Sequence, residues 1–97
     1  MSPMYILATK FENIDIENRK EQGEKWYKLV KKKVPNIKWI AHYAILGPYD
    51  FLDIFEADNE VDAAKVSLLS RATGATIAES WTAIPYLNFI EFIEDLK

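Results

Sequence analysis

The sequence of 97 residues contains no cysteine and a single histidine, His42. Without cysteine there is no disulfide, no thiolate nucleophile and no Cys-based metal site. One histidine alone does not build a typical zinc site. The sequence also lacks a phosphate-binding glycine loop, a nucleophile elbow and a dinucleotide-binding motif. We therefore expect no metal and no cofactor, and the absence of cysteine is consistent with the cytoplasm.

Positive charge is also scarce, with 12 Lys and Arg against 15 Asp and Glu and a net charge of −3. This balance argues against nucleic-acid binding, which requires a positive surface. The one basic cluster, Lys28 and residues 31–33, falls at the expected end of a helix, where cations suit the helix dipole. No apolar run approaches 18 residues, and no basic segment precedes an apolar one at the N-terminus. We expect neither a membrane span nor a signal peptide.

Apolar side chains, in contrast, are abundant: 49% of residues are hydrophobic, 13% are aromatic and 28% are charged. This composition is typical of a globular protein and excludes global disorder. A chain of this length supports one hydrophobic core. We therefore expect a single domain over residues 1–97.

Apolar patterning and turn residues predict seven elements. Branched and aromatic runs predict strands at 4–11, 37–46, 51–56 and 75–84. Helical spacing predicts helices from Asn13 or Asp15 to 34, from Asp58 or Asn59 to Ala72, with Gly74 as the stop, and over 86–96. This order predicts an α+β ferredoxin-like βαββαβ sandwich with a C-terminal helix, in which both main helices lie on one face of an antiparallel sheet.

The inward faces of the two main helices follow from the same spacing. The first helix is expected to bury Ile16, Gly23, Trp26, Tyr27, Val30 and Val34, and the second to bury Val61, Ala64, Leu68 and Ala72. Gly23 lowers helix stability by up to ~1 kcal/mol relative to alanine. This leaves open whether the first helix starts before or after it.

Both faces of the expected sheet are mainly apolar. With Pro48 and Tyr49 as the centre of a two-residue turn, one face carries Ile40, His42, Ala44, Leu46, Phe51, Asp53 and Phe55. The other carries Trp39, Ala41, Tyr43, Ile45, Leu52 and Ile54. A bare apolar face of this size exceeds what a soluble monomer tolerates. We expect the C-terminal helix to cover part of it and a second copy the rest, which predicts a homodimer and leaves higher assembly open.

Four segments together resemble the GYD-domain family over nearly the whole chain. These are LGPYDFLDIFEA, DNEVDAAKVSLL, TIAESWTAI and YLNFIEFIE, and the Gly-Tyr-Asp cluster corresponds to Gly47, Tyr49 and Asp50. The resemblance implies a dimeric α+β barrel, in which two ferredoxin-like sheets pack face to face. It implies no settled biochemical activity.

The Gly47–Asp50 turn has a structural explanation that we favour over catalysis. Gly47 can supply an unusual backbone angle, Pro48 presets a turn, and Asp50 can accept hydrogen bonds from turn N–H groups. The cleft between the sheets is expected to take a small apolar ligand. The candidate ligand-binding residues are Tyr49, Asp50, Phe51 and Trp81.

His42 and Asp53 are the candidate catalytic residues. In the expected register they are diagonal neighbours, with α-carbons ~7 to 8 Å apart. Facing the barrel interior, they form an acid–base couple that Glu79 could join. The alternative, which we favour, is a buried structural pair, and a one-residue slip would move both to the helix side.

The sequence therefore favours a small homodimeric module for ligand binding or sensing. The alternative is a cofactor-independent enzyme, similar to a monooxygenase or isomerase, that uses His42 and Asp53 for proton transfer. A purely structural role in assembly is a third hypothesis.

Overall fold

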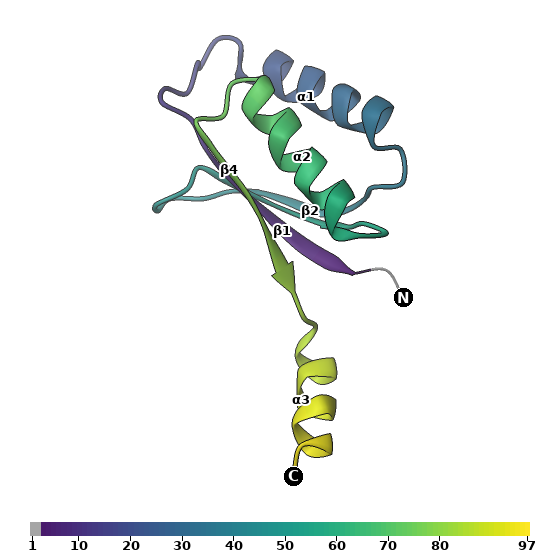
Figure 1. Cartoon of the computed structure of the whole chain (residues 1–97). Coiled ribbons are helices and arrows are strands. Elements are labelled where there is room, and N and C mark those ends of the chain that lie inside the picture. Colours follow the sequence, from purple (N-terminus) through teal and green to yellow (C-terminus); the bar gives the residue numbers. More distant parts are fainter. Residues whose placement is uncertain (1–2) are drawn as a thin grey trace.

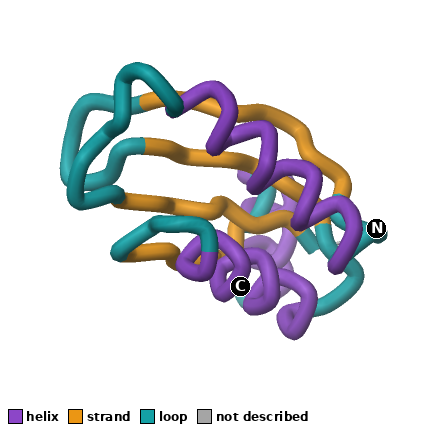
Figure 2. The backbone as a smooth tube through the Cα atoms, turned by 90° about the horizontal axis from the view of Figure 1, so that it is seen from above, coloured by secondary structure: helices purple, strands orange, loops and turns teal. Residues whose placement is uncertain are grey.

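The computed structural model describes residues 3–97. Its elements are β1 (Met4–Lys10), α1 (Arg19–Lys33), β2 (Lys38–Ala44), β3 (Phe51–Glu56), α2 (Glu60–Ala72), β4 (Ile77–Ala83) and α3 (Tyr86–Asp95). The four strands form one antiparallel sheet in the order β2-β3-β1-β4. Figures 1 and 2 show α1 and α2 over the same face of this sheet. The predicted α+β ferredoxin-like fold is confirmed.

The hydrophobic core lies between that face and the two helices. Its largest fully buried side chains are Leu7 of β1, Val30 of α1, Phe55 of β3 and Val66 of α2. Tyr5 stacks on Phe55 with ring centroids 5.6 Å apart. Alternation along each strand then places the residues between these positions on the opposite face.

Helix α1 begins later than its sequence pattern suggests. Its N-cap is Asn18, whose side chain makes no capping hydrogen bond. Asp15 instead accepts hydrogen bonds from the backbone N–H groups of Glu17 and Asn18, both at 3.2 Å, and so closes a turn ahead of the helix. Ile16 is 92% exposed and outside the helix, so its predicted burial is wrong. Gly23 lies inside α1, which therefore starts before it.

Helix α2 has the predicted ends but not the predicted inward face. Asn59 caps it by accepting a hydrogen bond from the N–H of Asp62 at 2.9 Å, and Gly74 follows it with φ 117°. Its buried residues are Ala63, Val66 and Ser70, whereas the predicted ones are exposed: Val61, Ala64, Leu68 and Ala72. Ser80 of β4 contacts α2 directly, because its Oγ donates to the Ala63 carbonyl at 2.9 Å and lies 2.6 Å from Oγ of Ser67.

The β2–β3 hairpin is longer than the predicted two-residue turn. Ala44 pairs with Phe51, and the loop over residues 45–50 is closed by a hydrogen bond from the Ile45 N–H to the Asp50 carbonyl at 2.9 Å. A β-bulge between Trp39 and Ala41 also shifts the register. It turns Trp39 to the helix side, where its ring centroid lies 5.4 Å from that of Phe55. The predicted face of Trp39 is therefore wrong.

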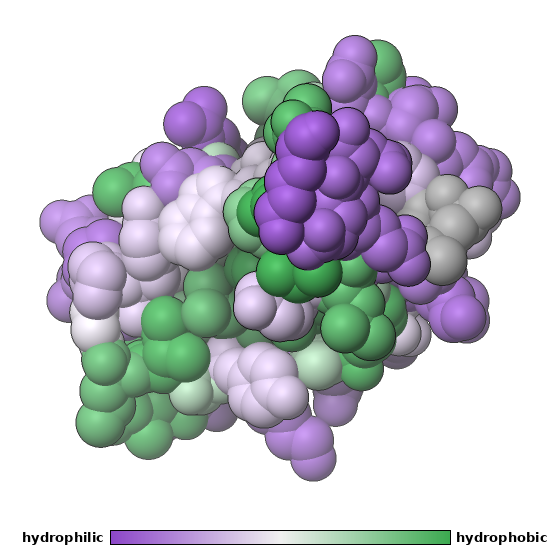
Figure 3. Space-filling view, turned by 90° about the horizontal axis from the view of Figure 1, so that it is seen from below, coloured by the Kyte–Doolittle hydropathy of each residue, from purple (hydrophilic) through white to green (hydrophobic). Residues whose placement is uncertain are grey.

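The second face of the sheet, here the open face, is not covered by a helix. Its residues are Met4, Ile6, Ala8, Lys10, Lys38, Ala41, Tyr43, Leu52, Ile54, Glu56, Ile77, Glu79, Trp81 and Ala83. Helix α3 projects away from the sheet, and none of its residues is buried (Figure 1). The expectation that it covers part of this face is wrong for the single chain. Figure 3 views the molecule from this side and shows apolar residues around the projecting helix.

Candidate functional site

The structure brings His42 and Asp53 together on the helix side of the sheet. They are direct cross-strand partners rather than diagonal ones, and Nδ1 of His42 lies 2.7 Å from Oδ1 of Asp53. Asp53 shares its face with the core residue Phe55 and is 7% exposed. The prediction that the pair faces the barrel interior is wrong, because the helices cover this face. A role in proton transfer stays a prediction.

Aromatic rings surround this pair. The centroid of the His42 ring lies 5.0 Å from that of Trp39 and 6.3 Å from those of Trp26 and Tyr27. Burial raises the pKa of Asp53, while the hydrogen bond and charge of His42 and the charge of Arg19 oppose that increase. His42 itself stays partly accessible, with 45% of its side chain exposed. Solvent therefore reaches the pair mainly at His42.

Arg19, the first residue of α1, is a feature that the sequence did not reveal. Its guanidinium carbon lies 4.7 Å from the ring centroid of Phe11 and 4.6 Å from that of Phe51, which is cation–π distance. Partial burial lowers the pKa of Arg19. No local pattern could have marked it, because the two rings come from segments far apart in the sequence.

A cavity of about 60 Å³ lies between α1, α2 and the sheet. Arg19 and Asp53 both line it, together with Phe11, Trp26 and Phe51. Phe51, predicted to bind a ligand between two sheets, therefore faces this internal space instead. The cavity is walled by rings but holds two oppositely charged groups.

Asp50 holds the β2–β3 loop against the end of β1. Its carboxylate oxygen Oδ2 accepts a hydrogen bond from the N–H of Phe11 at 2.8 Å, and its own N–H donates to the Thr9 carbonyl at 2.8 Å. These contacts reach another strand, not the turn itself. Among residues 3–97, Gly74 alone has a positive φ, so the prediction of an unusual backbone angle at Gly47 is wrong.

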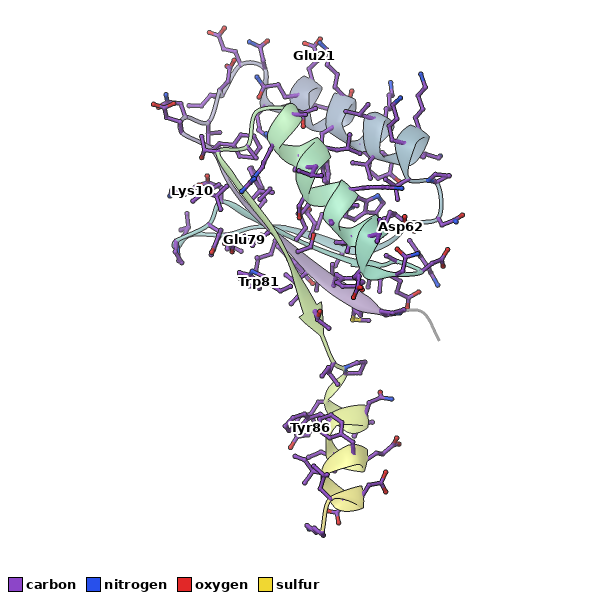
Figure 4. All side chains as sticks on the ribbon, viewed as in Figure 1. Lys10, Glu21, Asp62, Glu79, Trp81 and Tyr86 are labelled. Atoms are coloured by element: carbon purple, nitrogen blue, oxygen red, sulfur yellow. The ribbon has the colours of Figure 1, made fainter. Side chains whose placement is uncertain are left out.

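The open face carries a polar cluster formed by Tyr49, Glu79 and Trp81. The Tyr49 hydroxyl donates to Oε1 of Glu79 at 2.7 Å, and Nε1 of Trp81 donates to the same oxygen at 3.1 Å. The two hydrogen bonds lower the pKa of Glu79, and the first raises the pKa of Tyr49. Figure 4 shows Glu79 and Trp81 on β4. Glu79 cannot join His42 and Asp53, because it lies on the opposite face of the sheet.

Comparison with known proteins identifies the family. A family model described as the GYD domain matches residues 5–93. The chain belongs to the GYD-domain family. The resemblance seen in the sequence is thereby confirmed over almost the whole chain.

Two further proteins are similar to this GYD domain. One, from Thermus thermophilus, is named glutamine synthetase and cystathionine beta-lyase binding protein. It is 33% identical over 54 residues, which span 56% of this chain and 57% of the relative. The other is the crystal structure of FFRP-DM1, with a TM-score of 0.54, 17% identity and coverage of 84% of this chain and 99% of that one. The second likeness supports the fold alone.

The four candidate ligand-binding residues of this GYD domain fall into two groups. Tyr49 and Trp81 meet at the open face, with ring centroids 5.5 Å apart. Asp50 and Phe51 lie toward Phe11 and the helices. Ligand binding by any of them stays a prediction, but one site cannot use all four from the same side of the sheet.

Two absences apply to the described part of the GYD domain. Over residues 3–97 no three His, Cys, Asp or Glu side chains are grouped as a metal site would require. Over the same residues, none of the helices has the length and apolar character needed to cross a membrane.

Proposed function

We propose that this GYD domain is a small homodimeric binding module, with residues 1–97 acting as one domain. The open faces of two copies pack together and enclose a cleft for a small, largely apolar ligand. The observation that carries this proposal is the uncovered apolar face. Tyr43, Trp81 and Ile77 on this face are 56%, 39% and 38% exposed in the single chain.

The total surface of the chain supports a second copy as the cover. A compact monomer of 11.2 kDa exposes roughly 5,700 Å², whereas this chain exposes 6898 Å². The difference of roughly 1,200 Å² exceeds the ~800 Å² that each partner buries in a standard interface. A two-fold symmetric dimer would cover the same patch on both copies.

The cluster of Tyr49, Glu79 and Trp81 suggests which ligand the cleft prefers. Both hydrogen bonds to Glu79 go to Oε1, so Oε2 has no hydrogen-bond partner within residues 3–97. An ionised carboxylate only accepts hydrogen bonds. The surrounding face is mainly apolar, with Lys10, Lys38 and Glu56 at the ends of its strands. A ligand with an apolar body and one hydrogen-bond donor therefore matches this surface.

Sedimentation velocity tests the dimer. At ~10 μM the sedimentation of the wild-type chain should correspond to a particle of twice the monomer mass, because apolar interfaces of this size are stable at that concentration. Leu52→Glu places a charge in the open face and should give a monomer. Leu68→Glu, the matched change on the outer side of α2, should remain dimeric. A wild-type monomer would contradict the proposal.

Matched probes test the ligand preference. Indole carries an N–H donor, and benzothiophene has nearly the same shape without one. We expect indole to bind the dimer more tightly by about tenfold, and Glu79→Gln to reduce that preference, since a charged acceptor strengthens the hydrogen bond. Isothermal titration calorimetry measures both affinities. Equal binding of the two probes would exclude recognition by Glu79.

A second candidate function is binding to another protein. The Thermus thermophilus relative is named for binding two enzymes, and α2 presents an exposed apolar stripe of Val61, Ala64, Leu68 and Ala72. Titration with purified glutamine synthetase and cystathionine beta-lyase tests this idea. Leu68→Glu should then abolish binding to the enzymes, whereas Leu52→Glu should not. In the test of the dimer the roles are exchanged, because Leu52→Glu is the variant expected to disrupt it.

The enzyme alternative does not gain support from these positions. It required His42 and Asp53 to line the cleft between two sheets, whereas both lie on the helix side. We therefore do not assign proton transfer to the proposed cleft.

A further inference from the structure

Two oppositely charged side chains line the cavity under α1 without pairing with each other. Arg19 and Asp53 both border this space of about 60 Å³, and no ion pair joins them within residues 3–97. We propose that the cavity is a binding site for a small zwitterion, with a carboxylate at Arg19 and an ammonium group at Asp53. This site lies inside one protomer and does not depend on the proposed dimer cleft.

Arg19 is positioned by packing rather than by hydrogen bonds. Its guanidinium rests against the rings of Phe11 and Phe51, and its donors have no acceptor within residues 3–97. A guanidinium has five N–H donors in a planar fork that matches a carboxylate. Gly23, one turn along α1, lies beside it: a Cβ there would lie 3.5 Å from Nη2 of Arg19, an ordinary contact distance. The arginine is therefore held in place with its donors unused.

Asp53 is the complementary group. One oxygen, Oδ1, contacts His42, whereas Oδ2 has no hydrogen-bond partner within residues 3–97. Over the same residues no fully buried side-chain oxygen lacks a partner, so Oδ2 must reach accessible space. The residue is 7% exposed. Burial raises the pKa of Asp53 and lowers that of Arg19, while the attraction between the two side chains opposes both changes.

The class of ligand follows from charge and size. A simple anion would be attracted to Arg19 but repelled by Asp53. A simple cation would be attracted to Asp53 but repelled by Arg19. A molecule with both charges satisfies both side chains. The cavity holds about four to six water-sized groups, so the two charges must be separated by only one or two carbon atoms. Glycine, with five heavy atoms, fits this description.

An open groove of about 360 Å³ provides an approach to the cavity. Arg19, Trp26 and Asp53 line both the groove and the cavity, whereas His42 lines the groove but not the cavity. Lys20 also lines the groove but not the cavity. A ligand that enters through the groove would first meet Arg19, Trp26 and Asp53, which border both spaces. Lys20 carries the same charge as Arg19 but does not line the cavity, so its substitution serves as a control for nonspecific attraction.

Nuclear magnetic resonance titration of ¹⁵N-labelled protein tests the proposal. Glycine should shift the amide signals of Phe11, Phe51 and Ser70, with a dissociation constant on the order of 1 mM for so small a ligand. Acetate and methylammonium each carry one of the two charges. Both should bind at least about tenfold more weakly than glycine, because each can pair with only one of the two charged side chains.

Variants separate the roles of the two side chains. Arg19→Gln and Asp53→Asn should each weaken glycine binding about tenfold or more, whereas Lys20→Gln should leave it unchanged. Arg19→Lys keeps the charge and should fall between wild type and Arg19→Gln, which covers the case in which the glutamine variant does not fold. Leu52→Glu should retain glycine binding even as a monomer.

Three outcomes would overturn the proposal. The first is the absence of shifts at these amides with glycine at ~50 mM, well above the expected dissociation constant, which would mean that the cavity holds only water. The second is equal binding of acetate and glycine. The third is an equal effect of Arg19→Gln and Lys20→Gln, which would show that surface charge alone attracts the probe.

Discussion

At the scale of single residues, Asp53 combines burial with a hydrogen bond to His42. The two effects act in opposite directions on its pKa, and burial is the larger, so the pKa in the folded state is raised above 3.8. The folded chain then keeps a proton on Asp53 at pH values where the unfolded chain has lost it. Stability from this group is full below pH 3.8 and declines as pH rises through the folded pKa.

Replacing Asp53 by asparagine should remove that decline. The new amide side chain keeps an oxygen that can accept a hydrogen bond from His42 but cannot ionise. We expect the free energy of unfolding of Asp53→Asn, relative to wild type, to increase with pH above 3.8 by at most about 1.4 kcal/mol per pH unit. Urea unfolding at several pH values measures this difference.

Asp58→Asn, which removes an exposed carboxylate, is the control for the loss of one charge. A difference between wild type and Asp53→Asn that stays constant with pH would contradict the expected role of burial. A difference that decreases as pH rises would show that the contact with His42 outweighs burial.

At the scale of elements, one glycine lies within α1 and another follows α2, and the two have different backbone requirements. Gly74 follows α2 with φ 117°, a conformation that side chains with a Cβ rarely adopt. Gly23 lies within α1 in a helical conformation that alanine adopts more readily. The same substitution should therefore have opposite effects at the two positions.

Gly74→Ala should destabilise the fold. The left-handed conformation costs alanine about 1 to 2 kcal/mol, while the new Cβ would meet Phe11 only at an ordinary contact distance of 3.7 Å. Thermal and urea unfolding at matched protein concentration measure the loss. Unchanged stability would show that the end of α2 can relax to a negative φ.

Gly23→Ala should stabilise α1 by up to about 1 kcal/mol through helix propensity. The nearest atom to the new Cβ is Nη2 of Arg19 at 3.5 Å, which is an ordinary contact. An increase in unfolding free energy is therefore expected in the same assay. A decrease would mean that the guanidinium of Arg19 cannot tolerate the added methyl group.

At the scale of the whole molecule, α3 extends the chain far beyond a compact shape. The radius of gyration is 14.8 Å, against roughly 12.5 Å for a compact domain of this length. A helix of ten residues is marginal alone in water, and Phe89 and Phe92 remain 39% and 41% exposed. In the proposed dimer, the partner supplies the contacts that α3 lacks.

Replacing Phe89 and Phe92 by serine should therefore weaken self-association. Each buried phenylalanine contributes about 1.5 to 3 kcal/mol, and a symmetric dimer contains each position twice. Sedimentation equilibrium should show an increase in the dimer dissociation constant of several orders of magnitude. The control replaces Asn88 and Glu91, on the polar side of α3, by serine. Equal effects of the two pairs would exclude α3 from the interface.

The sequence alone determined the order of the elements and the family. Strand and helix signals are local, so Asn59 and Gly74 marked the ends of α2 correctly and residues 51–56 matched β3 without error. The proximity of His42 and Asp53 was also predictable, because strand pairing brings them close in either register that keeps their face.

Only the tertiary structure decided which face of the sheet the helices cover. Both faces are apolar, so alternation could not assign His42 and Asp53 to the helix side or Glu79 to the open face. The bulge beside Trp39 and the packing of Arg19 on Phe11 and Phe51 also depend on contacts between distant segments. Such contacts leave no local pattern, because their free energy exists only when the whole sheet and both helices have assembled.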